Sequence, residues 1–205
     1  KFTKDGKFVM QIGRKGQSKG NKDTQNVGQA ADTFVHSATN ELFVADGYGN
    51  RRIIVFDADT GAFKRMWGAF GNEPLDKVPD PPKVPESQRI PAMEISDRGP
   101  EQFVRPVHAV RVSNDGLVYV SDRGGKRVQV FTLEGKFLSE IQVQPESKAD
   151  GSTWDVEFSK DPAQKYLYVA DGRNQKVHIY DRKSMVELTN FGTGGHYPGQ
   201  WYSLH

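Results

Sequence analysis

Three segments of this chain repeat one pattern, at Leu42–Asp57, Val118–Thr132 and Leu167–Asp181. Each is an apolar run that ends in Asp, followed by a tight polar turn, a basic residue and an alternating run with an aromatic residue near its end. Two such runs around a short turn predict a β-hairpin. A hairpin that returns every 40 to 50 residues or so is typical of the blades of a β-propeller. The pattern therefore predicts an all-β fold of four-stranded blades.

Twelve strands are expected in three complete blades, each running from an inner to an outer strand. We expect them at 31–36, 41–45, 52–56 and 62–67 in the first blade, at 106–112, 117–121, 127–131 and 136–141 in the second, and at 154–158, 166–170, 176–180 and 185–191 in the third. Residues 1–13 match only the outer half of a blade, and residues 200–205 match the start of an inner strand. We therefore expect one propeller domain over 1–205, with three complete and two partial blades.

These blades would leave open strand edges, which proteins normally avoid. We expect the chain to be part of a longer, six-bladed propeller, since closed propellers have roughly 4–8 blades. The alternative is that the two ends pair into one shared closing blade. An insertion at about 72–100 holds seven of the eleven prolines and interrupts the repeats. We expect it to be extended and exposed, either as a solvated loop or as a lid over the channel mouth that offers a surface to a protein partner.

The composition excludes several classes of protein. No apolar run approaches the ~20 residues of a membrane helix. The net charge is only +2, with both signs interspersed, so we expect no nucleic-acid partner. The absence of cysteine excludes disulfides and thiolate metal ligands. The chain starts within a blade pattern at Lys1 rather than at Met, and we expect a processed protein that is secreted or periplasmic.

The most regular repeat resembles a known family. The stretch EQFVRPVHAVRVSNDGLVYVSDRGGKRVQVFTLEGKF, at Glu101–Phe137, resembles the NHL-repeat propellers. Within that family, DGYGNRRI at Asp46–Ile53 is similar to a segment of the peptidyl-α-hydroxyglycine α-amidating lyases and their bacterial relatives. That segment bears the tyrosine which acts as base in those lyases.

The resemblance implies roles for four residues of this chain. Tyr48 is the base, and Arg123 in SDRGGKRVQ is the active-site arginine. His108 in PVHAV and His205 in YSLH are zinc ligands. A further zinc histidine and a second arginine of the family belong to earlier blades, which this chain does not contain. The resemblance implies zinc as the cofactor and admits calcium as a second metal.

Alignment of the inner strands gives a separate reason to group some of these residues. It places Asp32, His108, Trp154 and His205 at one structural position, near one mouth of the central channel. Imidazoles from alternate blades can converge there, and catalytic zinc takes about three protein ligands. The two histidines are an incomplete set, to which Asp32 but not Trp154 can add a ligand. Each histidine also has a structural interpretation, in which it bonds a neighbouring backbone carbonyl.

Tyr48 lies in the hairpin turn between Gly47 and Gly49, which allow the backbone to bend and bring the ring over the channel. A phenol is a poor base at neutral pH unless cations stabilise the phenolate. Arg123, at nearly the equivalent place in the next blade, and a metal ion are the candidate cations. The alternative is an exposed turn tyrosine with no chemical role.

Residues that recur in every blade are expected to be structural. One carboxylate follows each second strand, and we expect it to accept amide hydrogens of the turn. These carboxylates belong to Asp46, Asp122 and Asp171. The cations that follow them, which we expect to cross-link blades, are Arg52, Arg127 and Lys176. The histidines expected only on the surface or in packing are His36, His178 and His196.

The residues and the resemblance together predict a carbon–nitrogen lyase. It would use zinc to split a peptidyl-α-hydroxyglycine into a peptide amide and glyoxylate. The substrate, a peptide or a small molecule, would bind at the channel mouth. The alternative is a non-catalytic NHL-repeat propeller that binds a protein, peptide or glycan on the same mouth without a metal. Replacing Tyr48 by Phe separates the two, because only a lyase would lose turnover.

Overall fold

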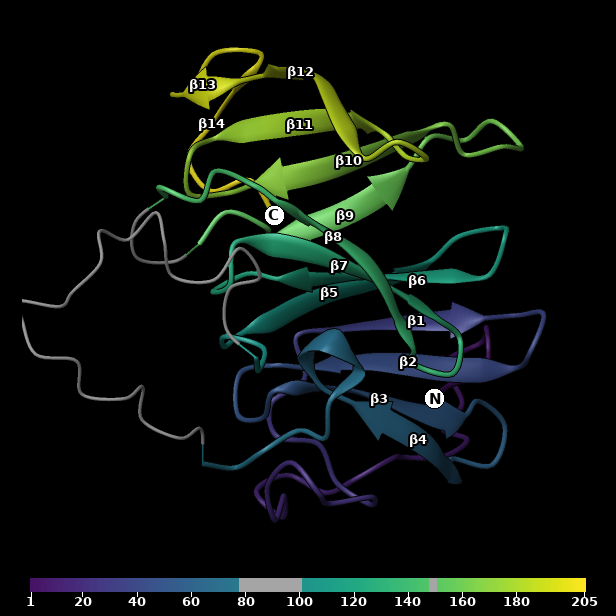
Figure 1. Cartoon of the computed structure of the whole chain (residues 1–205). Helices are drawn as coiled ribbons and strands as arrows, with labels where there is room; N and C mark the ends of the chain where they lie inside the picture. Colours follow the sequence, from purple (N-terminus) through teal and green to yellow (C-terminus); the bar gives the residue numbers. More distant parts are fainter. Residues whose placement is uncertain (78–100, 148–150) are drawn as a thin grey trace, which may run out of the picture.

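A computed structural model of the chain describes residues 1–77, 101–147 and 151–205. It confirms the all-β architecture, with three four-stranded antiparallel sheets whose strands follow one another in chain order (Figure 1). The first blade holds β1 (Asp32–His36), β2 (Glu41–Asp46), β3 (Arg52–Asp57) and β4 (Phe63–Trp67). The second holds β5 (Val107–Val112), β6 (Leu117–Asp122), β7 (Arg127–Thr132) and β8 (Phe137–Gln142). The third holds β9 (Asp155–Phe158), β10 (Tyr166–Asp171), β11 (Lys176–Asp181) and β12 (Val186–Phe191).

Every strand of the three blades begins and ends within one residue of its expected position. In each hairpin the second and third strands pair in one unbroken register between the turns, so the strand bounds follow from the apolar runs and the turn residues. A short 3-10 helix, η1 (Ala69–Gly71), follows β4 and contacts β7 of the second blade. Among the described residues, no helix has the length and apolar character that a membrane crossing requires.

The blades pack face to face and share two apolar cores. One core joins the first and second blades through side chains such as Phe43, Ile53 and Val110. The other joins the second and third blades through side chains such as Tyr119, Val156 and Leu167. The inner strand β5 contacts both β1 and β9, so the three inner strands are neighbours. Figure 1 shows β5 between the other two. Residues that begin these strands therefore come together at one mouth.

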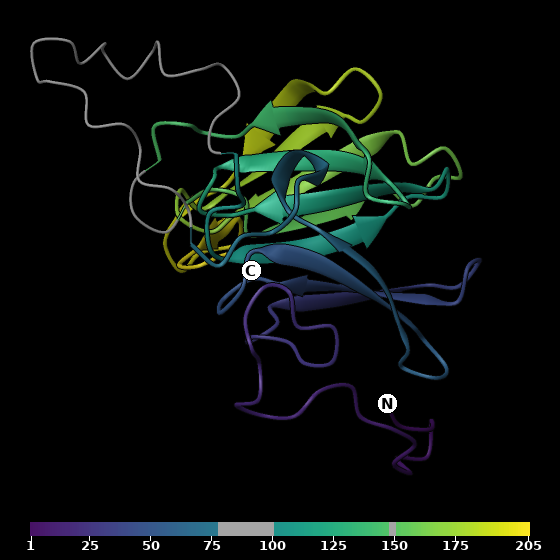
Figure 2. The ribbon, with the colours of Figure 1, turned by 60° about the horizontal axis from the view of Figure 1, so that its bottom comes forward.

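The two ends of the chain lie at opposite blades. Figure 2 shows the N-terminal segment running beside the first blade. It contains one isolated antiparallel bridge, between Phe2 and Phe8, where the outer half of a blade was expected. At the other end, β13 (Thr193–Gly194) and β14 (Gln200–Trp201) form a small parallel pair, which differs from the expected start of an inner strand at 200–205. Most of the proline-rich insertion lies outside the described residues, so a lid or partner surface there stays a prediction.

Candidate active site

The turn between β2 and β3 holds Tyr48 against the second blade. Gly47, which begins this turn, lies so close to Val107 that a Cβ atom there would overlap the carbonyl oxygen of Val107. The backbone N–H of Tyr48 donates to the carbonyl of Gln29 at 3.2 Å. Val107 and Gln29 thus hold the turn on its two sides. The side chain of Tyr48 is 47% exposed and extends from this turn to His108 near the beginning of β5.

Tyr48 and His108 form the central contact of the site. The phenol oxygen lies 3.1 Å from Nε2 of His108, and Nδ1 of the same ring lies 2.5 Å from the carbonyl oxygen of Trp154. A carbonyl only accepts hydrogen bonds, so Nδ1 carries the proton and Nε2 accepts the phenol hydrogen. Burial, together with the positive charge of Arg123 and the nearby His205, lowers the pKa of His108 although the Trp154 carbonyl raises it. His108 is therefore a neutral imidazole with a defined tautomer.

His205 completes an aromatic cluster with this imidazole. Its ring centroid lies 5.0 Å from that of His108 and 4.8 Å from that of Trp154, almost perpendicular to the indole. Both histidines line a small cavity of about 130 Å³ between the starts of the three inner strands. Figure 1 shows the end of the chain beside β9. Residues that are far apart in the sequence thus meet as expected, although their chemical roles stay predictions.

Asp32, the third ligand considered from the sequence, is engaged elsewhere. One carboxylate oxygen accepts a hydrogen bond from the guanidinium of Arg111 and, at 3.1 Å, from the backbone N–H of Val110. The other oxygen accepts the N–H of Thr33 at 2.7 Å. Arg111 also pairs with Asp155 at 3.3 Å. Asp32 therefore links the first blade to the second through Val110 and Arg111. The sequence does not predict this contact.

The residues fit a zinc ion only in part. Neutral imidazole is a ligand that zinc prefers, and the Nδ1–H bond to a carbonyl orients His108 as in many metal sites. The described residues nevertheless contain no group of three or more His, Asp or Glu side chains arranged to hold a metal ion, so neither zinc nor calcium finds a complete site among them. His108 and His205 are the two imidazoles that line the cavity at this mouth, and their role as zinc ligands stays a prediction.

Arg123 stands beside the cluster rather than in its centre. Its guanidinium carbon lies 3.7 Å from the centroid of the Trp154 ring, and the residue is almost buried. Stacking on indole holds the cation in place. Arg123 thus supplies fixed positive charge close to His108.

Comparison with known proteins places this site within a family. A family model described as lactonase, 7-bladed beta-propeller, matches residues 84–198, more than half of the chain. The chain belongs to this family. The seven blades in the description are one more than the six expected for the parent propeller. The described residues of this lactonase-family chain form three complete four-stranded blades.

Two relatives of the lactonase-family chain come from Xenopus laevis. Peptidyl-glycine alpha-amidating monooxygenase A is 32% identical over 123 residues, and peptidyl-glycine alpha-amidating monooxygenase B is 29% identical over 123 residues. In both cases the match covers 60% of this chain and 11% of the relative. The chain therefore corresponds to only about a tenth of these proteins. The similarity agrees with the resemblance drawn from the motif around Tyr48.

Solved structures show the propeller fold alone. Kuenenia stuttgartiensis hydrazine synthase superposes with a TM-score of 0.54 and 16% identity, over 89% of this chain and 40% of that chain. The RRP9 WD40 repeats superpose with a TM-score of 0.51 and 12% identity, over 82% of this chain and 39% of that chain.

The recurring aspartates of this lactonase-family chain are the centres of buried networks. Asp46 pairs with Nε of Arg52 at 2.9 Å, and Asp122 pairs with Nε of Arg127 at 2.8 Å. Each carboxylate also accepts a backbone N–H from the segment that leads into its blade, from Gly28 and from Val104. These contacts fit the structural role expected for the aspartates. Among the described residues, the side-chain hydrogen bonds of Arg52 and Lys176 stay within their own blade or reach its leading segment, which differs from the expected cross-link between blades. The guanidinium of Arg127, in contrast, lies 4.8 Å from the ring centroid of Phe70 in η1, the helix that follows the first blade, so this cation does join two blades.

The third blade uses a histidine in place of the arginine. Lys176 occupies the expected position but reaches Asn190 at 2.9 Å. His178 instead contacts Asp171 through Nε2 at 3.3 Å and Glu187 through Nδ1 at 2.9 Å. Its side chain is completely buried. From the sequence, His178 was expected only on the surface or in packing. Its ionic role could not be predicted, because the pairing of β11 with β12 is what brings Glu187 to it.

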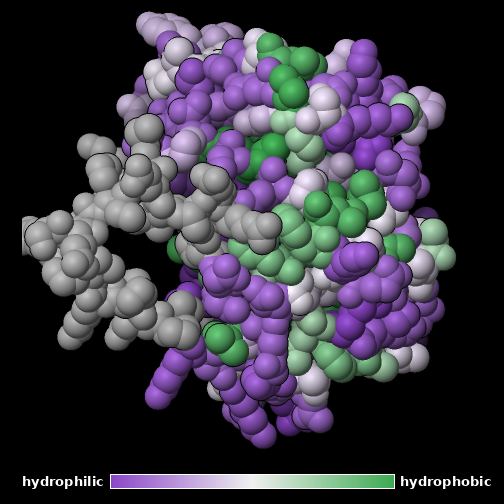
Figure 3. All heavy atoms as spheres, viewed as in Figure 1, coloured by the Kyte–Doolittle hydropathy of each residue, from purple (hydrophilic) through white to green (hydrophobic). Residues whose placement is uncertain are grey.

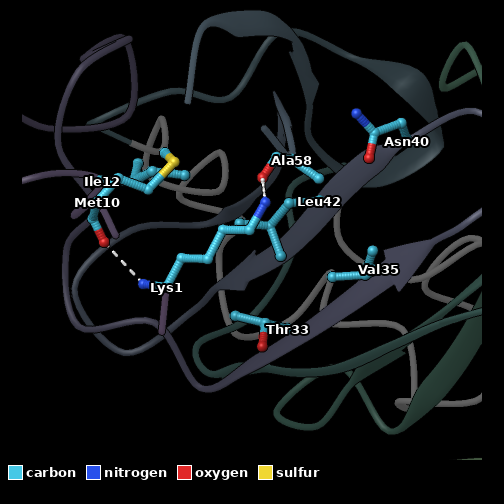
Figure 4. A pocket seen from close by; sticks show the side chains of 8 residues that line it. All are labelled: Lys1, Met10, Ile12, Thr33, Val35, Asn40, Leu42 and Ala58. Atoms are coloured by element: carbon cyan, nitrogen blue, oxygen red, sulfur yellow. Dashed lines mark hydrogen bonds between the residues drawn. The ribbon is translucent and has the colours of Figure 1, made fainter. Parts of the chain in front are cut away.

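A larger cavity lies away from Tyr48. It has a volume of about 420 Å³ and separates the N-terminal segment from β1 and β2 (Figure 4). Met10 and Ile12 face Val35 and Leu42 across it, while Lys1 donates to the carbonyl of Ala58 at 2.9 Å. This cavity contains no histidine or carboxylate side chain, so its chemistry is that of an apolar groove.

Proposed function

We propose that this propeller is a carbon–nitrogen lyase that splits peptidyl-α-hydroxyglycine into a peptide amide and glyoxylate. The observation that carries the proposal is the contact of the Tyr48 phenol with a neutral, oriented His108, in ring contact with His205. Similarity to two alpha-amidating monooxygenases supports the same choice of chemistry. The non-catalytic platform has no comparable observation in its favour.

The reaction breaks the C–N bond and needs two proton transfers, one from the hydroxyl oxygen and one to the nitrogen. The hydroxyl of the substrate loses its proton, and its oxygen becomes the carbonyl oxygen of glyoxylate. The electron pair of the C–N bond passes to nitrogen, which takes up a proton and leaves as the amide. A base near the hydroxyl and a proton donor near the nitrogen are therefore required.

Tyr48 is suited to both proton movements. Its hydrogen is directed at Nε2 of His108, so the remaining lone pairs of the phenol oxygen face away from the imidazole and toward the open side of the turn. Before the reaction the phenol releases its own proton to solvent, which the positive charge of Arg123 favours. The phenolate of Tyr48 then accepts the hydroxyl proton and passes that same proton to the departing nitrogen. The half-exposed position of the ring lets a peptide end reach it from solvent.

The surrounding residues hold and polarise the substrate. Arg123, fixed on Trp154, supplies positive charge for the carboxylate of the hydroxyglycine. A zinc ion held by His108 and His205 would supply polarisation of a substrate oxygen. Nε2 of His108 has one lone pair, so that nitrogen would give up its hydrogen bond to Tyr48 if it held the ion, and the phenol would then be free.

The test is turnover of a defined substrate by the 205-residue chain. An N-acylated tripeptide that ends in α-hydroxyglycine is incubated with the zinc-supplemented chain, and glyoxylate and peptide amide are measured together. We expect both products in equal amounts, a loss of rate with a chelator and recovery with zinc. A rate equal to that of the substrate alone in the same buffer would contradict the proposed function.

A further inference from the structure

The segment 11–29 forms a wall beside the Tyr48 turn. The N–H of Gly49 donates to the carbonyl of Gly28 at 2.6 Å, and the N–H of Arg51 donates to Oδ1 of Asn21 at 2.7 Å. Asn21 is buried, and its side chain also donates to the carbonyl of Leu75 at 3.0 Å. The wall is therefore anchored to the same turn that carries Tyr48.

A cavity of about 530 Å³ lies between this wall and the turn. Four of its nine lining residues are glycines, which come from both sides, and polar side chains come from Lys15, Ser18, Gln29 and Asn50. Two further hollows, of about 390 Å³ and 240 Å³, follow the wall and are lined by Arg14, Lys19 and again Lys15. Volumes of this size are typical of sites for small ligands and short peptides.

The positive charge of the chain is concentrated on this side. Residues 1–22 hold seven of the 28 Lys and Arg residues but only one of the 26 Asp and Glu residues. The charges are thus less evenly interspersed than the net value of +2 suggested. The surface over the N-terminal segment, at the lower edge of Figure 3, is largely hydrophilic.

The cations at the cavities are available to a ligand. Within 1–77, 101–147 and 151–205, no carboxylate forms an ion pair with Arg14, Lys15 or Lys19. The nearby Asp23 accepts backbone N–H groups of Lys19, Gln25 and Asn26 instead. On the other side of the turn, Arg105 donates to the carbonyl of Gly49 at 3.2 Å and adds a further cation.

We propose that these cavities bind the acidic residues of a peptide whose C-terminal end lies at Tyr48. The inference rests on the proposed function, and it names the substrate class as peptides with Asp or Glu upstream of the hydroxyglycine. Gly49 and Asn50 follow Tyr48 directly and line the cavity, so a peptide that leaves the active site over this turn enters it. The polar side chains of Ser18 and Gln29 in the lining can form hydrogen bonds to the peptide main chain, and the cations select its side chains.

The test measures binding separately from turnover. A fluorescein-labelled nonapeptide that ends in unmodified glycine and carries three upstream Glu residues is titrated with the chain by fluorescence polarisation. A second peptide has Lys at the same three places. We expect the acidic peptide to bind at least ten-fold more tightly, with an affinity that falls as salt increases.

A matched pair of variants tests the location. Lys15→Glu/Lys19→Glu reverses two charges at the cavities. Lys4→Glu/Lys7→Glu makes the same charge change on exposed residues that precede the wall and line none of the three cavities. We expect about a ten-fold loss of affinity for the first variant and less than a two-fold change for the second. Equal losses would mean a general charge effect and would overturn the inference. Tighter binding of a single-stranded oligonucleotide of equal charge would also overturn it.

Turnover of the hydroxyglycine tripeptide by the unsubstituted chain is measured in parallel. Glyoxylate release without a preference for acidic peptides would refute the inference and leave the proposed function intact. A preference for acidic peptides without glyoxylate release would refute the proposed function and leave the cavities as an acidic-peptide site.

Discussion

The phenol oxygen of Tyr48 lies 3.1 Å from Nε2 of His108, a residue sixty positions further along the chain. This contact joins the turn of the first blade to the inner strand of the second. Because the other nitrogen of the ring is tied to the Trp154 carbonyl, the single lone pair of Nε2 serves either the phenol or a metal ion. The chemistry of the site depends on which of the two it binds.

Zinc affinity should report this competition. His108→Ala and His205→Ala should each weaken zinc binding at least about ten-fold, because each removes a nitrogen donor. Tyr48→Phe should bind zinc at least as tightly as the unsubstituted chain, since the competing hydrogen bond is gone. Isothermal titration calorimetry measures all three, with the exposed His196→Ala as control. Zinc affinities that are the same in all these variants would rule out the two histidines as ligands.

Gly47→Ala should destabilise the chain by about 1–3 kcal/mol, because the new Cβ overlaps the Val107 carbonyl and pushes the Tyr48 turn away from β5. Gly194→Ala is the matched control, since the nearest atom to its Cβ would lie 3.6 Å away. Urea denaturation gives both free energies of unfolding. Equal stability of the two variants would show that the turn does not need this close approach.

Arg52→Met should destabilise the first blade by about 3–5 kcal/mol, since it leaves the completely buried carboxylate of Asp46 without its cation. Lys176→Met removes the cation at the equivalent place in the third blade. Among the hydrogen bonds of the described residues, the Lys176 side chain forms one, to the side chain of Asn190. That change should cost about 0.5 kcal/mol or less. Thermal unfolding followed by circular dichroism distinguishes the two, and a similar cost for both would contradict the structural role of the Asp46–Arg52 pair.

Stability should fall as the pH rises above about 6.5, the ordinary pKa of histidine. Burial lowers the pKa of His178, but hydrogen bonds to Asp171 and Glu187 outweigh it and raise the pKa. The charged ring therefore stabilises the folded state below pH 6.5, and this contribution is lost as the pH passes the raised value. His178→Gln should flatten the profile between pH 6.5 and 9, whereas the exposed His196→Gln should not. A wild-type profile that stays flat over this range would contradict the ionic role of His178.

Much of the fold was predictable because it depends on local patterns. The hairpin around Asp46 and Gly47 follows from alternation and turn residues, and the equivalent hairpins repeat it. The meeting of His108 with His205 was also expected, since alignment of the repeats placed both at the head of inner strands that share one mouth. The expected strand did not form around His205, which follows β14 instead.

The remaining features depend on contacts between distant segments. Nothing in the sequence indicates that Arg111 would engage Asp32, or that the Trp154 carbonyl would fix the tautomer of His108. The partner of Asp171 was missed for a similar reason. Lys176 follows the repeat, yet strand pairing brings His178 and Glu187 together on the buried side. A repeat predicts where a side chain begins, but its partner comes from the neighbouring strand.

The most direct measurement is the rate of glyoxylate release by Tyr48→Phe in the zinc-loaded chain. The proposed function predicts a fall in kcat of about 10²–10⁴-fold with little change in KM, because only the proton acceptor is lost. Tyr202→Phe, a change at an exposed ring beside His196, should leave the rate unchanged. A Tyr48→Phe chain that releases glyoxylate within two-fold of the unsubstituted rate would contradict the role of Tyr48 as the base.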